Sequence, residues 1–126
     1  VGYDGSKAAE DALMAAQKHA KVFNAELHIL TSLLQSPTLK NVDIEKAESK
    51  LDKLLRAAKK ENITCEAHAS VSYQSPGEDL VQFATENEID HLFVGIEKRS
   101  KTHKMLLGST AQYVILKAPC PVTSVK

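Results

Sequence analysis

The feature that most constrains the fold is a regular alternation of short apolar runs with longer amphipathic segments along all 126 residues. Five runs have the composition of strands: residues 1–3, 27–31, 63–71, 89–95 and 121–125. Each of the four segments between them contains apolar residues at intervals of three and four, which is typical of helices. This alternation predicts an α/β fold, a doubly wound parallel five-stranded sheet with helices on both faces.

Local signals indicate where the four helices begin and end. Ser6 is expected to cap the first helix, which stops near Asn24. The second helix is predicted to begin at Asp43, and the run Ser75-Pro76-Gly77-Glu78 opens the third. The fourth is expected over Gly108 to Lys117.

Composition narrows the functional class. The length corresponds to a single domain over residues 1–126. Sixteen basic and sixteen acidic residues cancel, so we expect no nucleic-acid partner. No apolar run approaches the roughly 20 residues of a membrane span, so we expect no membrane partner either.

The two cysteines, Cys65 and Cys120, are not spaced as in a metal site or a redox motif. We therefore expect both to be reduced thiols in a cytoplasmic protein. The chain opens within a strand-like run, so we expect a few residues to be missing from its start.

The segment most informative about function follows the fourth strand. That strand ends at Gly95, a basic loop comes next, and Gly108-Ser109-Thr110 stands where the last helix begins. A helix start offers unpaired N–H groups and the positive end of its dipole, which favour an anion. Asp4 follows the first strand, and ligands of such folds bind beyond the carboxyl ends of the strands. We therefore predict one cleft with an acidic group on one wall and phosphate donors on the other.

The whole chain resembles the universal stress protein family. The resemblance rests on Val1-x-x-Asp4-Gly5-Ser6, Leu27-His28-Ile29-Leu30, the Gly95 loop with Arg99-Ser100, Leu106-Leu107-Gly108-Ser109 and Ala118-Pro119-Cys120-Pro121-Val122. It implies the strand order 3-2-1-4-5 and a homodimer that pairs through the last strand, Val122 to Val125. An edge strand with unpaired backbone groups favours the same contact. In ATP-binding relatives it also implies a nucleotide pocket, marked by Gly-x-x-Gly, nine residues, then Gly-Ser or Gly-Thr.

One residue departs from that pattern. In Gly95-Ile96-Glu97-Lys98, a lysine stands at the position of the second glycine, and nine residues then precede Gly108-Ser109. A glycine there would let the backbone approach phosphate closely. Two alternatives stay open: Lys98 pairs with phosphate as a point charge, or its side chain occupies the pocket.

Seven residues are candidates for nucleotide binding: Asp4, Ser32, Gly95, Lys98, Gly108, Ser109 and Thr110. The resemblance implies that Asp4 touches the nucleoside and that Ser32 contacts adenine through backbone atoms. The alternative for Asp4 is a turn whose carboxylate caps the first helix. The alternative for Ser32 is an ordinary serine at a strand end.

The sequence contains no recognisable catalytic or metal-binding pattern. Ser109 has no assignable His and carboxylate partners, and neither a Gly-x-Ser-x-Gly elbow nor a P-loop occurs. The five histidines lack ligand spacing, so we expect no metal site: His19, His28, His68, His91 and His103.

We therefore expect a cytoplasmic homodimer that senses or sequesters an adenine nucleotide, ATP or AMP, without turning it over. Mg²⁺ would accompany ATP. Two alternatives remain. One is a protein-interaction module of the same fold that binds no nucleotide. The other is an enzyme, either a slow ATPase or a protein that phosphorylates itself with the nucleotide, for which Asp4 is the nearby carboxylate.

Overall fold

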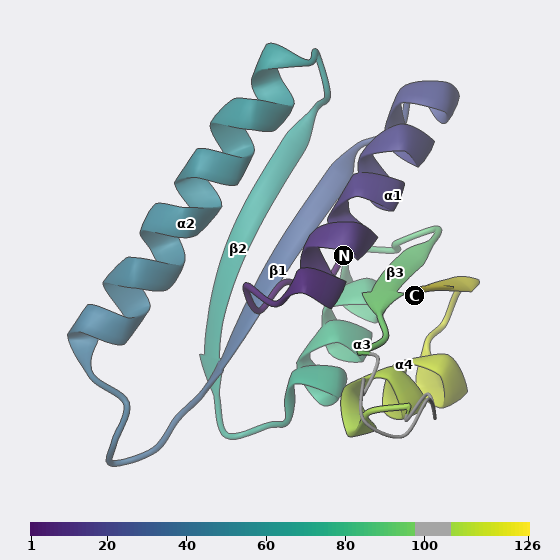
Figure 1. The fold of residues 1–126 in the computed structure, drawn as a ribbon. Helices are drawn as coiled ribbons and strands as arrows, with labels where there is room; N and C mark the ends of the chain where they lie inside the picture. The colour runs from purple at the N-terminus through teal and green to yellow at the C-terminus, as the bar shows by residue number, and fades with distance from the viewer. Residues whose placement is uncertain (98–106) are drawn as a thin grey trace.

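A computed structural model describes residues 1–97 and 107–126 (Figure 1). Helices and strands alternate in the order α1 (Lys7–Phe23), β1 (Leu27–Leu34), α2 (Asn41–Lys60), β2 (Cys65–Ser72), α3 (Pro76–Glu86), β3 (Leu92–Gly95), α4 (Ser109–Lys117) and β4 (Val122–Val125). The predicted α/β alternation is thus confirmed. None of the helices described has the length and apolar character needed to cross a membrane.

The strands pair in parallel, β1 with β2 and β3 with β4. Residues 1–3, predicted as a strand, form a single bridge between Gly2 and Leu30 instead. The N–H of Tyr3 donates to the carbonyl of Leu30 at 2.8 Å, and the N–H of Leu30 donates to the carbonyl of Val1 at 2.9 Å. Three residues that meet one neighbouring strand are too few for a regular ladder, but they run parallel to β1 beside it.

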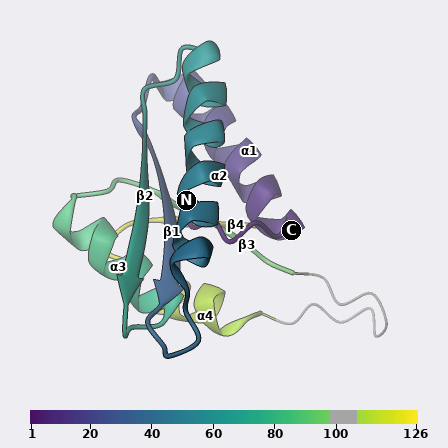
Figure 2. The same ribbon diagram turned by 90° about the vertical axis from the view of Figure 1, so that its left-hand side faces the viewer.

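Helices cover both faces of the paired strands, as predicted. Leu27 and Ile29 of β1 point to the core beneath α1 and α2, and Leu30 points to a second core beneath α3 and α4. This alternation follows from the two-residue period of a strand. Figure 2 shows α1 and α2 on one side of β1 and β2, and α3 on the other.

Side-chain caps set three helix starts. The hydroxyl of Ser6 caps α1 and that of Ser75 caps α3, both as predicted. Helix α2 begins at Asn41 and not at Asp43. The reason is that the Asp43 carboxylate caps from inside the first turn, where it accepts the N–H of Lys40 at 2.9 Å.

Both cysteines are free thiols, half-buried at the margins of the two cores. Burial raises the pKa of the Cys65 thiol and of the Cys120 thiol. A raised pKa keeps a thiol protonated and weakly nucleophilic near neutral pH. Neither cysteine therefore has the character of a reactive nucleophile.

Candidate functional site

A cavity of about 470 Å³ lies beyond the carboxyl ends of β1 and β3, beside the starts of α1 and α4. Six of the predicted binding residues line it: Asp4, Ser32, Gly95, Gly108, Ser109 and Thr110. Lys98, the seventh, lies outside the described residues. The predicted cleft is therefore present, and the fold gathers its walls from segments about a hundred residues apart.

The start of α4 offers backbone donors to this cavity. Gly108 is the N-cap, with an extended backbone (φ −64°, ψ 161°) and no side chain that could cap the helix. The first intrahelical bond runs from the N–H of Gln112 to the carbonyl of Gly108 at 3.0 Å. The N–H groups of residues 109–111 thus lie ahead of the helical pattern, and no capping side chain meets them within the described part of the chain. Such a helix start favours negative charge.

Gly95 forms the wall of the cavity where β3 ends, and it packs against α1. A Cβ at this position would lie 2.3 Å from the carbonyl oxygen of Ala8 and 2.4 Å from its carbonyl carbon. Real Cβ atoms do not approach backbone so closely. The contact between helix and strand therefore requires glycine here, whether or not a ligand is bound.

Asp4 lines the cavity and also holds a turn together. Its Oδ1 accepts the N–H of Ser6 at 2.9 Å, across Gly5, whose φ of 85° favours glycine. The turn of that alternative is therefore present, although the Ser6 hydroxyl, and not the Asp4 carboxylate, caps α1. Within residues 1–97 and 107–126, Oδ2 of Asp4 forms no hydrogen bond, so one oxygen of this exposed carboxylate can still accept from a ligand.

Ser32 is tied to a buried carboxylate that is not among the predicted residues. Its hydroxyl donates to Oδ2 of Asp79, a residue of α3 that is 6% exposed. The hydroxyl of Ser72 lies 2.8 and 3.0 Å from the two oxygens of the same carboxylate. The Ser32 hydroxyl is therefore occupied, and its backbone remains as the group that can meet a ligand. An Asp in the first turn of a helix is too common to identify Asp79 from sequence.

The cavity is lined by backbone amides, carboxylates and apolar side chains. Its described lining includes no Lys or Arg, so the α4 amides are its positive feature. Two carboxylates line the cavity: Asp4, which was predicted from the sequence, and Glu97, which was not. Leu30, Leu80 and Val94 supply an apolar surface. The arrangement suits a ligand with a flat apolar part, hydroxyl donors and an anionic end.

Comparison with known proteins agrees with this architecture. The model of the Universal stress protein family matches residues 1–126. A universal stress protein structure from Archaeoglobus fulgidus superposes with a TM-score of 0.87 and 34% identity, over 99% of this chain and 95% of that chain. The universal stress protein from Archaeoglobus fulgidus in complex with dAMP superposes with a TM-score of 0.82 and 30% sequence identity. The match covers 99% of this chain and 94% of that chain.

A curated relative agrees with these structures. A universal stress protein of Methanocaldococcus jannaschii is 27% identical over 134 residues, covering 98% of this chain and 78% of its own length. On this match of sequence and fold, the chain belongs to the universal stress protein family.

Proposed function

We propose that this protein binds an adenine nucleotide, ATP or AMP, in the cavity at the start of α4. The observation that carries the proposal is the set of amides at residues 109–111, which no side chain of residues 1–97 and 107–126 caps and which border the same cavity as the Asp4 carboxylate. The dAMP complex of the Archaeoglobus fulgidus protein supports an adenine nucleotide over other anions. The apolar lining gives the base a surface to pack against.

Each part of the nucleotide has a matching group. The phosphate would accept hydrogen bonds from the N–H groups of Ser109 and Thr110. A ribose hydroxyl would donate to Asp4, and adenine would meet the backbone of Ser32. Lys98 would add a point charge toward the phosphates. Mg²⁺ accompanying ATP prefers phosphate and carboxylate oxygens, and Asp4 and Glu97 offer that chemistry.

The role we propose is sensing in a stress response, in the cytoplasm and without turnover. Catalysis would need a positioned base, and Asp4 already uses one oxygen to hold its turn. The subunits would form a homodimer through β4. Among the strands described, β4 pairs with β3 alone, so its other edge can receive a second copy. The pairings of β2 with β1, of β1 with residues 1–3 and of β3 with β4 are three of the four that a single sheet of order 3-2-1-4-5 needs. The fourth, between residues 1–3 and β3, is part of this proposal.

Isothermal titration calorimetry of the wild-type dimer with ATP, ADP and AMP tests the proposal, with GTP as the test of base preference. Saturable heat with adenine nucleotides is expected. Gly108→Asp should weaken binding because its carboxylate would compete with phosphate for the amides. Asn41→Asp adds the same charge at the exposed start of α2 and should bind normally. Absence of heat at millimolar nucleotide, with a folded dimer confirmed, would overturn the proposal.

The second candidate is an interaction module of the same fold that binds no nucleotide. It is favoured by Lys98 at the position of the second motif glycine and by the occupied hydroxyl of Ser32. On this alternative, Lys98→Gly should create nucleotide binding that the wild type lacks. A wild-type protein that binds as tightly as that variant would exclude it.

A further inference from the structure

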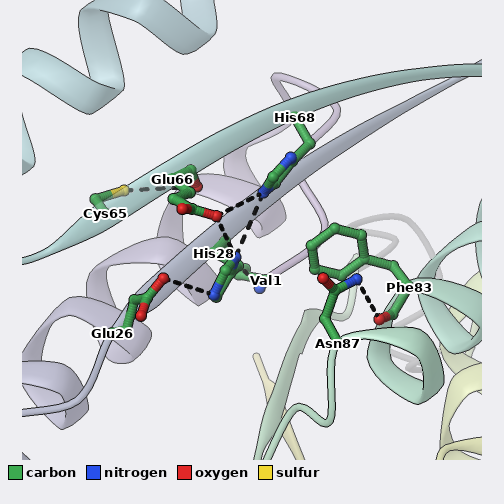
Figure 3. A network of polar contacts seen from close by, with 8 residues as sticks. All are labelled: Val1, Glu26, His28, Cys65, Glu66, His68, Phe83 and Asn87. Carbon is green, nitrogen blue, oxygen red and sulfur yellow. Dashed lines mark hydrogen bonds and ion pairs between the residues drawn. The ribbon is translucent and has the colours of Figure 1, made fainter.

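Three side chains that can bind metals converge on the surface of β1 and β2: His28, Glu66 and His68 (Figure 3). The parallel register sets His28 opposite Glu66, and His68 stands two residues further along β2. The two-residue period of a strand brings all three to the face covered by α3. The expectation of no metal site rested on spacing along the chain, whereas this cluster arises from the pairing of two strands.

The three nearest atoms form a nearly equilateral triangle. Nδ1 of His28 lies 3.4 Å from Nε2 of His68 and 3.5 Å from Oε2 of Glu66. The remaining side, from Nε2 of His68 to Oε2 of Glu66, is 3.6 Å. A tetrahedral ion with bonds of about 2.1 Å holds its ligand atoms about 3.4 Å apart. Octahedral Mg²⁺ holds adjacent ligands about 3.0 Å apart. The triangle therefore has the dimensions of three corners of a tetrahedral site.

A fourth residue fixes the orientation of His28. Its Nε2 lies 3.1 Å from Oε1 of Glu26, so the ring donates its Nε2 proton to that carboxylate. This tautomer leaves Nδ1 with a free lone pair, directed toward His68 and Glu66 as Figure 3 shows. A carboxylate that accepts from the distal nitrogen is the usual partner of a metal-bound histidine.

The surroundings give the cluster one closed and one open side. The ring of Phe83 lies against both imidazoles, with centroids 5.7 Å from His28 and 4.8 Å from His68. The His28 side chain is 17% exposed and that of Glu66 is 58% exposed. One wall is thus apolar, and the other side leaves room for a water ligand. Without a metal, one proton can form a hydrogen bond between only two of the three facing ligand atoms. A cation at the centre would bind the lone pairs of all three.

We propose that His28, His68 and Glu66 bind one Zn²⁺ ion, with water in the fourth position and Glu26 as the positioning residue. Two imidazoles favour zinc over Mg²⁺ or Ca²⁺, which prefer oxygen ligands. The site lies toward the amino ends of β1 and β2, whereas the nucleotide cavity lies beyond the carboxyl ends. It is therefore independent of nucleotide binding.

The test is a Zn²⁺ titration of the full chain, stripped with EDTA and free of any polyhistidine tag, in competition with a chromophoric zinc indicator. One zinc per chain is expected. Loading with Co²⁺ should give the intense visible absorption of a tetrahedral site. His68→Gln should weaken Zn²⁺ by more than the roughly 10–100-fold expected for Glu26→Gln, which keeps all three ligands.

His91→Gln is the matched control, because His91 is not part of this cluster. Its ring instead packs against that of His19, with the two ring centroids 4.9 Å apart. It should leave zinc affinity unchanged. Circular dichroism and urea midpoints without metal confirm that each variant is folded, and nucleotide titration of His68→Gln should match the wild type. Unchanged zinc affinity in the double variant His28→Gln/His68→Gln would overturn the proposal. Absence of stoichiometric binding to the wild type would overturn it as well.

Discussion

The end of β3 passes so close to α1 that a Cβ on Gly95 would lie 2.3 Å from the carbonyl oxygen of Ala8. This contact gives the first glycine of the nucleotide motif a packing role of its own. It also sets the distance between the start of α1, which carries Asp4 just ahead of it, and the strand end that forms the opposite wall of the cavity. Architecture and binding site therefore depend on the same residue.

Gly95→Ala should consequently destabilise the fold. Backbone atoms of Ala8 cannot move aside as a flexible side chain can, so we expect a loss of about 2–3 kcal/mol in the free energy of unfolding. Urea denaturation measures it. Gly108→Ala is the control, because a Cβ there meets nothing within 4 Å, and it should cost about 1 kcal/mol or less. Equal losses in the two variants would contradict the packing role of Gly95.

Gly108→Asp should have opposite effects on stability and on binding. The new carboxylate would cap α4 and raise the free energy of unfolding by about 0.5 kcal/mol. It would also occupy the amides that phosphate needs, and we expect nucleotide affinity to fall by at least about tenfold. Calorimetry and urea denaturation on the same preparation give both values. A variant that is more stable yet binds nucleotide as tightly as wild type would place the phosphate elsewhere.

Asp79→Ala should reveal the strength of the contact between α3 and the strands. The substitution leaves the hydroxyls of Ser32 and Ser72 without their acceptor, so we expect a loss of about 2 kcal/mol in unfolding free energy. Asp52→Ala removes an exposed carboxylate from α2 and should change stability by less than about 0.5 kcal/mol. A loss at Asp79 as small as this control would show that the network contributes little.

The lowered pKa of His91 should make the stability of the fold depend on pH. Desolvation, and then the neighbouring His19, lower the pKa of His91 from its ordinary value of 6.5. The unfolded chain therefore binds a proton before the folded one does, and stability is lost as the pH falls below about 6.5. Urea midpoints at pH 7.5 and 5.5 should differ less for His91→Gln than for wild type. An identical pH dependence in the two proteins would remove His91 as its source.

Much of the fold could be predicted because its signals are local. Apolar periodicity and the hydroxyls of Ser6 and Ser75 mark the helices, and each depends on residues a few positions apart. Asp4 and Gly95 could be predicted because parallel strands deliver their carboxyl ends to one edge, and Gly108, Ser109 and Thr110 because a helix start offers free amides. Ser32 was predicted from the family resemblance alone.

Features that depend on distant segments could not be predicted. The carboxylate of Asp79 is buried because it contacts serines from two strands. His28 and His68 are 40 residues apart in the sequence and meet only because β1 and β2 pair in this register. Residues 1–3 have strand composition, but a regular strand also needs a ladder of neighbours. Burial and pairing of this kind are decided by the whole fold and leave little trace in the local pattern.

The central claim is that the amides at the start of α4 hold the phosphate of an adenine nucleotide. Amide chemical shifts of ¹⁵N-labelled protein during a titration with AMP test it most directly. We expect saturable shifts that are largest at Ser109, Thr110 and residue 111, with smaller ones at Gly95. Saturable binding that leaves those amides unmoved, or no shift at millimolar AMP and ATP, would contradict the claim.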